Sequence, residues 1–295
     1  MRAWLAPLLA LVVAGCGEEA LPALDAGPGD AGPVDLGVMD GGGDVDAGTQ
    51  DAGTQDTGTG DAGAEDAGTG EARRVLFVGN SYTFYNDLPE LYAATAPSSP
   101  EVASRTAGGW TLVRHAGDAE LATLLAEGWD VVVLQEQSQI PGFPEGNADR
   151  AASLASAEAL AAAAGAARIV LFLTWGRRDG DARNPDLFPD YATMQGRLNA
   201  GYAAMRDALE AAGHTVVIAP VGPAFGELEA TDEALFRALY AGDGSHPSPL
   251  GSQLAALVFA RVIGGADLEA LARPDDVGED DWAALVRAVR DAATP

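Results

Sequence analysis

A serine and a closely spaced aspartate and histidine are the side chains in this sequence best suited to nucleophilic catalysis. Ser81 follows the apolar run "VLFVG" after one residue, and Asp243 and His246 stand three positions apart in "AGDGSHPSP". A serine hydroxyl becomes a nucleophile when a base takes its proton and a third group orients that base. On a turn, Asp243 can accept a hydrogen bond from Nδ1 of His246 and leave Nε2 free for Ser81. We therefore expect a Ser-His-Asp triad. The alternatives are that Ser81 is a turn residue and that the other two cap the following helix.

The other two histidines fit the role of the base less well. His214 stands at the amino end of an expected strand, and His115 has no acidic residue nearer than Asp118. The histidines do not have the spacing of a zinc site, and the sequence contains no glycine-rich phosphate-binding loop. We accordingly expect chemistry that needs no metal and no cofactor.

A triad of this kind also needs hydrogen-bond donors for the oxyanion that forms on the substrate. Gly108 and Gly109 in "TAGGW" can bring backbone N–H groups close, while Gln135 and Gln137 in "LQEQSQ" follow an expected buried strand. With the backbone N–H of Ser81, these residues make up the expected oxyanion hole. The alternatives are an ordinary tight turn for the glycines and a solvated loop position for Gln137.

Aromatic and basic side chains on the same expected loops could bind a substrate. Trp110 and Trp175 could pack on a sugar ring, Asn80 precedes the serine, and Arg177 and Arg178 could bind an acidic group. Alternatively, the tryptophans cover the core and the arginines pair with the aspartates beside them.

These residues need a scaffold that brings distant loops together, and the chain from Arg73 onward predicts one. Short runs that are apolar throughout alternate with longer helical patterns, as is typical of a parallel sheet covered on both faces. The expected strands are Val75–Gly79, Glu101–Thr106, Asp130–Leu134, Arg168–Thr174 and His214–Ala219. The longest expected helices are Ala148–Ala164, Tyr191–Ala212, Pro249–Val262 and Asp280–Ala292. We predict one α/β domain at 73–295, a three-layer α/β/α sandwich with about five parallel strands and its reactive loops at their carboxyl ends.

The blocks that carry these residues resemble the SGNH (GDSL-type) hydrolase superfamily of serine esterases and lipases. "FVGNSYTFYNDLP" is similar to the serine block, with Gly-Asn-Ser in place of Gly-Asp-Ser, "TAGGW" to the glycine block and "DGSHPSPLGSQLAA" to the last block. The third block departs from the pattern, because Gln137 stands where the superfamily has asparagine. The strings "LQEQSQ", "GGWTL" and "LTWG" resemble a poorly characterised bacterial subfamily.

The resemblance implies a flavodoxin-like fold and a serine esterase that hydrolyses carboxylic esters. It implies Ser81 as the nucleophile, His246 as the base and Asp243 as the partner of the base. The sequence has no long apolar lid segment, which favours short acyl groups such as acetyl on a carbohydrate. Two alternatives stay open: a non-catalytic carbohydrate-binding or surface module on the same fold, and an O-acyltransferase that uses the same triad.

The N-terminal region carries signals for export rather than the pattern of a folded domain. The apolar run "AWLAPLLALVVAG" after Met1 and Arg2 is too short for an ordinary membrane span and predicts a signal peptide at 1–15. "LVVAGC" resembles a bacterial lipobox, which implies lipidation of Cys16, the only cysteine. The alternative is an ordinary signal peptide with an incidental cysteine. Residues 16–72, rich in Asp, Ala, Gly and Thr and without an aromatic residue, predict a disordered tether.

The charge of the chain excludes nucleic acid as a partner. The formal net charge is −27. The tether holds 14 of the 44 acidic residues and none of the 17 basic ones, and 30 acidic residues face 16 arginines from Arg73 onward. A domain with this balance has no basic surface for nucleic acid, and an anionic polymer would be a poor partner. We expect a small-molecule or carbohydrate ester as the partner of the domain. We expect a bacterial envelope location, with the lipid as the only attachment to a membrane, and leave the oligomeric state open.

Overall fold

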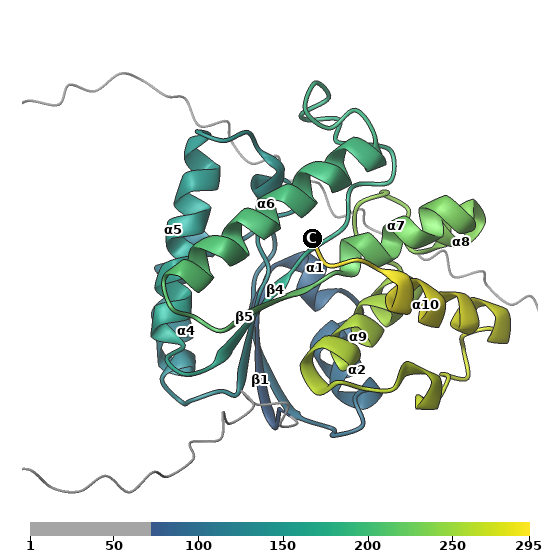
Figure 1. Cartoon of the computed structure of the whole chain (residues 1–295), viewed down its shortest axis with the longest axis horizontal. Helices are drawn as coiled ribbons and strands as arrows, with labels where there is room; N and C mark the ends of the chain where they lie inside the picture. Colours follow the sequence, from purple (N-terminus) through teal and green to yellow (C-terminus); the bar gives the residue numbers. More distant parts are fainter. Residues whose placement is uncertain (1–71) are drawn as a thin grey trace, which may run out of the picture. The chain divides into compact units, whose positions relative to one another are not determined.

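Five parallel strands form the centre of the described chain, which is residues 72–295 of a computed structural model (Figure 1). They are β1 (Arg74–Gly79), β2 (Glu101–Thr106), β3 (Val131–Leu134), β4 (Arg168–Phe172) and β5 (Val216–Ala219). Their order in the sheet is β2-β1-β3-β4-β5, and every neighbouring pair is parallel. The predicted five-stranded parallel sheet is therefore confirmed.

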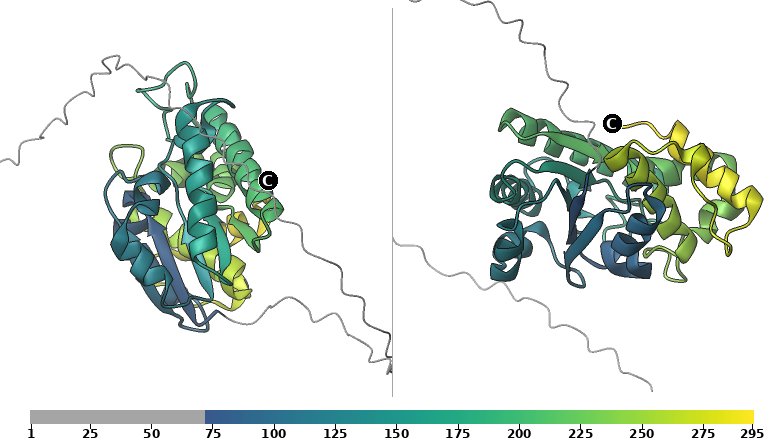
Figure 2. Two further views of the ribbon diagram at one scale, coloured as in Figure 1. Left: turned by 90° about the vertical axis from the view of Figure 1, so that its left-hand side faces the viewer. Right: turned by 90° about the horizontal axis from the view of Figure 1, so that it is seen from below.

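Helices cover both faces of this sheet (Figure 1 and Figure 2). One face packs against α2 (Leu88–Thr95), α7 (Val221–Thr231), α8 (Glu233–Ala238), α9 (Pro249–Gly264) and α10 (Glu279–Asp291). The other face packs against α3 (Leu112–Ala116), α4 (Ala119–Leu125), α5 (Ala148–Ala163) and α6 (Tyr191–Ala211). Short pieces complete the described chain: α1 (Ser81–Phe84) and the 3₁₀ turns η1 (Tyr85–Asp87), η2 (Ile140–Gly142) and η3 (Leu268–Ala270).

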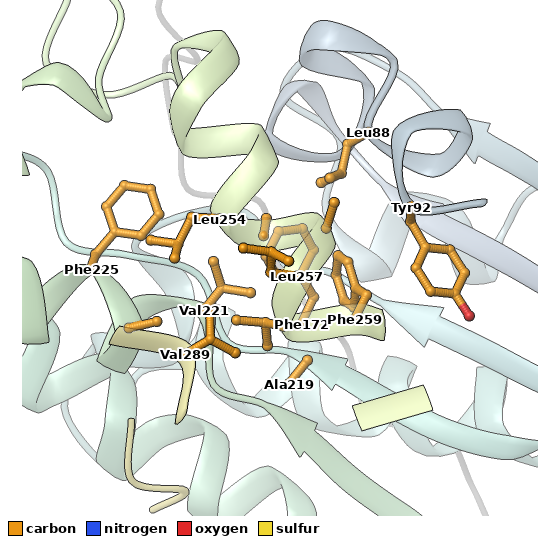
Figure 3. Packing of buried hydrophobic residues seen from close by; sticks show 14 of the residues in the cluster. Leu88, Tyr92, Phe172, Ala219, Val221, Phe225, Leu254, Leu257, Phe259 and Val289 are labelled. Carbon is orange, nitrogen blue, oxygen red and sulfur yellow. The ribbon is translucent and has the colours of Figure 1, made fainter. Parts of the chain in front are cut away.

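Strands β1, β3, β4 and β5 are mainly apolar because each of them contacts two cores, whereas the edge strand β2 is half polar and partly exposed. In β1, Val75 and Phe77 belong to the core under α2 and α9, whereas Leu76 and Val78 belong to the core on the opposite face. Successive side chains of a strand point to opposite faces, so a strand that is covered twice has no polar face. Figure 3 shows part of the first of these cores, with Phe259 beside Phe172. The ring of Phe259 packs edge-on against the rings of both Phe172 and Phe77.

The predicted elements differ from the observed ones mainly at their ends. β4 ends at Phe172 and β5 begins at Val216, so both strands are shorter than predicted. Helix α9 continues to Gly264 and ends where Gly265 adopts a left-handed φ of 65°, a conformation that glycine accepts readily. The helices α3, α4, α7 and α8 were not predicted; α3, α4 and α8 have five to seven residues, too few to show a helical repeat, whereas α7 has eleven.

The order of the strands determines where a ligand can bind. The chain passes from β1 to β2 on one side and then returns to place β3 on the other side of β1. In open α/β sheets, ligands bind beyond the carboxyl ends of the strands at such a reversal. Ser81 follows β1 and Gln137 follows β3, so both lie at this reversal.

The N-terminal predictions fall on residues that the structure does not describe. The expected signal peptide at 1–15, Cys16 and all of the tether except Ala72 lie outside residues 72–295. Within the described range, none of the helices combines the length and hydrophobicity that crossing a membrane requires.

Candidate active site

Ser81 begins helix α1 directly beyond the end of β1. Asn80 caps this helix, because its Oδ1 accepts a hydrogen bond from the N–H of Tyr82 at 3.1 Å. Gly79 leaves no space for a side chain, since a Cβ at this position would lie 2.5 Å from Oε1 of Gln135. The strand therefore passes tightly against its neighbour and leads straight into the serine.

Ser81, His246 and Asp243 form one chain of hydrogen bonds. Nε2 of His246 lies 2.9 Å from Oγ of Ser81, and Nδ1 lies 2.5 Å from Oδ2 of Asp243. The other carboxylate oxygen accepts the backbone N–H groups of Ser245 and His246, each at 2.9 Å. Burial opposes ionisation, but the hydrogen bonds from His246 and from these backbone amides hold the pKa of Asp243 below its ordinary value. The ionised carboxylate can therefore keep the proton on Nδ1 and direct Nε2 at the serine hydroxyl.

Local backbone contacts fix the loop that carries His246. The N–H of Ala241 donates to the carbonyl of His246 at 2.8 Å, and Gly244 adopts a left-handed φ of 67° inside the loop. Ser248 caps α9 by accepting a hydrogen bond from the N–H of Gly251. The loop is thus closed on itself and attached to the start of a buried helix.

Two tyrosines that were not predicted from the sequence pack against the imidazole ring. The ring of Tyr85 stacks on His246 with 4.3 Å between centroids and 11° between planes. Tyr82 meets the same ring edge-on at 5.6 Å, and its hydroxyl lies 2.7 Å from Oγ of Ser245. Both tyrosines closely follow Ser81 in the chain. Aromatic residues just after an expected nucleophile are the signal that could have identified them.

A cleft of about 650 Å³ opens beside Ser81 and His246. Its walls come from the loops after β1, β2, β3 and β4 and from the loop that carries the histidine. Most of the lining is polar or glycine, and the rings of Phe84 and Tyr85 add aromatic surface. Phe84 is 39% exposed, which is unusual for a large apolar side chain in this domain. The cleft therefore suits a polar ligand that also offers an apolar face.

Several of the predicted oxyanion donors lie at the wall of this cleft. Gly108, Gly109 and Gln137 all line it, and Gly109 needs its lack of a side chain for a φ of 68°. The N–H of Ser81 is the first amide of α1 and has no hydrogen-bond acceptor within residues 72–295. The side-chain amide of Gln137 donates to Oε1 of Gln139 at 3.0 Å, which engages one of its two N–H bonds.

The prediction that Gln135 belongs to the oxyanion hole is wrong. Its side chain is fully buried and does not line the cleft. Oε1 accepts hydrogen bonds from the N–H of Asn80 at 2.7 Å and from the hydroxyl of Thr83 at 3.0 Å, and Nε2 donates to the carbonyl of Glu136. Gln135 therefore stabilises the loop that carries Ser81 without facing the cleft.

Of the two tryptophans that could pack on a sugar, Trp175 cannot do so, and Trp110 is not part of the cleft lining. Trp175 is fully buried, with its ring stacked against Tyr82 at 4.8 Å and against Phe225 at 4.5 Å. Trp110 is half-buried, packs beside the ring of His115 at 5.0 Å and does not line the cleft. Trp175 is thus a core residue, which was the alternative interpretation, whereas Trp110 packs beside His115 outside the cleft.

The remaining polar candidates are engaged within the protein. Asn80 lines the cleft, but its Nδ2 donates to the carbonyl of Trp110 at 2.9 Å while its Oδ1 caps α1. Arg177 pairs with the buried carboxylate of Asp181. Arg178 forms two hydrogen bonds to Asp179, at 2.9 and 2.7 Å. The arginines thus pair with the neighbouring aspartates, as the second interpretation of the sequence predicted.

The other histidines lie away from the serine hydroxyl. His115 is buried, and its Nε2 lies 2.9 Å from the carbonyl oxygen of Gly79, to which it can donate. Burial lowers the pKa of His115, so its ring stays neutral and ties α3 to the end of β1. His214 stands just before β5, at the amino edge of the sheet. Within the described residues, no group of three or more His, Cys, Asp or Glu side chains could hold a metal ion.

Comparison with solved structures defines the family. A protein from Slackia heliotrinireducens, described as a candidate SGNH hydrolase, is 33% identical over 65% of this chain and 100% of that chain, with a TM-score of 0.53. A DUF4886 family protein from Bacteroides uniformis shares the fold at 19% identity over 74% of this chain and 93% of that chain, with a TM-score of 0.59. No protein-family model and no curated protein matches the sequence. The chain belongs to the SGNH hydrolases, and its strand order is the flavodoxin-like order.

Proposed function

We propose that the protein is a serine esterase that hydrolyses carboxylic esters. The observation that carries the proposal is the unbroken hydrogen-bonded chain from Asp243 through His246 to Ser81 beside an open cleft. A serine hydroxyl that only capped a helix would not need an oriented imidazole at 2.9 Å. Membership of a hydrolase family supports the same class of reaction.

Each group in the chain has one role in the reaction. Oγ of Ser81 attacks the ester carbonyl carbon while its proton passes to Nε2 of His246, and the carbonyl oxygen takes up the displaced electron pair. Donors on the cleft wall stabilise this oxyanion, and Asp243 stabilises the imidazolium. The tetrahedral intermediate then expels the alcohol, which takes the proton from Nε2. Water attacks the acyl-enzyme with His246 as base again, which releases the acid and restores Ser81.

The lining of the cleft favours a short acyl group on a polar alcohol, such as an O-acetyl carbohydrate. The exposed ring of Phe84 and the ring of Tyr85 offer aromatic surface on which a sugar ring can pack, and the other walls are mostly polar. Export by the signal peptide and anchoring through a lipidated Cys16 are part of the proposal.

A hydrolysis screen tests the proposed function. Acetylated sugars and p-nitrophenyl esters of increasing chain length are incubated with the wild-type protein and with Ser81→Ala. We expect rates that fall as the acyl chain lengthens and that disappear in Ser81→Ala. Products are analysed with and without an added sugar acceptor, since acyl transfer to the acceptor instead of water would identify a transferase. If the wild type hydrolyses none of these esters, or if Ser81→Ala retains its rate, the proposal is wrong.

A further inference from the structure

Two buried polar side chains behind the cleft have no role in the proposed reaction. Gln135 and Glu136 follow β3 directly, and both are fully buried. Burying an amide and a carboxyl group costs free energy unless hydrogen bonds compensate. Their partners therefore indicate what these two residues do.

Gln135 connects β3 to the loop that carries the nucleophile. Its Oε1 accepts the N–H of Asn80 at 2.7 Å and the hydroxyl of Thr83 at 3.0 Å, so it holds the residues on both sides of Ser81. Gly79 leaves the space that this contact needs, because a Cβ there would lie 2.5 Å from the same oxygen. The position of the Ser81 N–H is thus set by a side chain from the neighbouring strand.

Glu136 connects the two loops that carry the other oxyanion donors. Its Oε1 accepts the N–H of Gln137 at 2.6 Å and the N–H of Leu112 at 3.1 Å. Leu112 begins α3, three residues after Gly109, while Gln137 lies at the cleft wall. One carboxyl oxygen therefore fixes the glycine loop and the glutamine loop relative to each other.

We propose that Gln135 and Glu136 are positioning residues that set the geometry of the oxyanion site, one through the serine loop and the other through the glycine and glutamine loops. The inference rests on the proposed function, because it assigns these loops to oxyanion binding. It also explains the divergent string "LQEQSQ": two of its side chains hold the site together from behind, and the third, Gln137, lines the cleft. A displacement of about 1 Å in such a site can cost roughly 100-fold in rate.

The second oxygen of Glu136 is consistent with this role. Oε2 is buried and has no hydrogen-bond partner within residues 72–295. Burial raises the pKa of Glu136, while the nearby hydroxyl of Ser153 and the backbone N–H groups of Gln137 and Leu112 act against the rise. The contacts that the surrounding loops make with Glu136 thus converge on one acceptor oxygen, Oε1.

A purely structural role is the alternative, and Gln195 provides a matched control. Gln195 is also buried, and its Oε1 accepts the N–H of Gly176 at 2.8 Å, but that contact holds the loop after β4. Replacing Gln195 by leucine removes a comparable buried hydrogen bond without touching the three expected oxyanion loops. Loss of stability alone would therefore affect Gln195→Leu and the test variants alike.

The experiment measures kcat, KM and the thermal unfolding midpoint with p-nitrophenyl acetate as substrate. For Gln135→Leu and Glu136→Leu, we expect kcat to fall about 10- to 100-fold with KM changed less than about threefold. Glu136→Gln retains a carbonyl acceptor, so its kcat should stay within about threefold of the wild type. Gln195→Leu should lose a similar amount of stability and keep its kcat within about threefold.

Two results would overturn the inference. One is a kcat for both leucine variants within threefold of the wild type, and the other is an equal loss of kcat in Gln195→Leu at an equal loss of stability. If Glu136→Leu does not fold, Glu136→Asp shortens the carboxyl by one methylene, and an unchanged kcat in that variant also overturns the inference. If the wild type itself shows no hydrolysis that depends on Ser81, the proposed function fails instead.

Discussion

Asp243 orients the imidazole of His246, and the backbone of the same turn orients Asp243. One carboxylate oxygen accepts the Nδ1 proton of His246, and the other accepts two backbone N–H groups of the same turn. The backbone amides therefore hold the carboxylate in place, and the carboxylate in turn holds the imidazole. Tyr85 stacked on one side of the ring restricts its rotation further.

Asp243→Asn should lower kcat about 1,000- to 10,000-fold with little effect on KM, since an amide can hold the imidazole in the wrong tautomer. Asp190→Asn is the matched control, because Asp190 caps α6 and asparagine caps a helix equally well. Steady-state kinetics on p-nitrophenyl acetate would measure both variants. A kcat for Asp243→Asn close to that of Asp190→Asn would show that the carboxylate has no part in the reaction.

Two carboxyl groups of the site should respond to pH in opposite directions. The pKa of Asp243 is lowered, so its contribution to stability is present above the unfolded pKa of about 3.9 and is lost as the pH falls through the folded value. Burial raises the pKa of Glu136 instead. The contribution of Glu136 to stability is fully present below its unfolded pKa of about 4.3 and is lost as the pH rises through its folded pKa.

Glu136→Gln removes the second of these titrations. We therefore expect the stability of Glu136→Gln, relative to the wild type, to improve as the pH is raised from about 4 to 8. Urea unfolding at several pH values measures the difference. A difference that stays constant across this range would mean that Glu136 titrates as it does in the unfolded chain.

Among the elements that carry the site, the end of β1 leaves no space for a side chain at Gly79. A Cβ on Gly79 would lie 2.4 Å from Oγ1 of Thr83 and 2.5 Å from Oε1 of Gln135. The Thr83 hydroxyl donates a hydrogen bond to this Gln135 oxygen. Neither atom can move without breaking the contacts that hold the serine loop. A side chain at this position must therefore displace the loop.

Gly79→Ala should lower the free energy of unfolding by about 1–3 kcal/mol, the usual cost of overpacking. Gly196 in the middle of α6 has open space around it, so Gly196→Ala should stabilise the protein by roughly 0.5–1 kcal/mol. Urea denaturation of both variants gives the comparison. Equal effects of the two substitutions would contradict the account of Gly79.

The fold was largely predictable because β1, β3, β4 and β5 are covered on both faces and therefore show as apolar runs. The hydrogen-bonded arrangement of Ser81, His246 and Asp243 was predictable because Asp243 and His246 are close in sequence and the carboxyl end of β1 is defined by the run before Ser81. The distinction between Gln135 and Gln137 was not predictable. Both follow the same strand, and only the observed contacts show that Gln135 lies behind the cleft while Gln137 lines it.

The sequence also could not separate surface aromatic residues from core ones. Trp175 follows β4 at the correct edge of the sheet, yet its ring is enclosed between Tyr82 and Phe225. Phe84 and Tyr85, which do line the cleft, stand in a turn whose direction depends on two left-handed residues, Asn86 and Asp87. Such positive φ values in residues other than glycine are uncommon and are not evident from composition.

For the molecule as a whole, we propose that a lipid on Cys16 attaches the protein to a membrane. Cys16→Ser should release the protein from the membrane fraction while the specific activity of the domain stays unchanged, because the substitution lies far from the site in sequence. Fractionation followed by an esterase assay measures both properties. Unchanged membrane association of Cys16→Ser would rule out lipidation at this residue.

Covalent labelling with a fluorophosphonate, which reacts with an activated serine, tests directly whether Ser81 is the nucleophile. We expect that wild-type protein is labelled at one serine, that peptide mapping identifies Ser81, and that labelling is absent in Ser81→Ala and strongly slowed in His246→Ala. Folded wild-type protein that is not labelled, or that is labelled at another serine, would show that Ser81 is not an activated nucleophile.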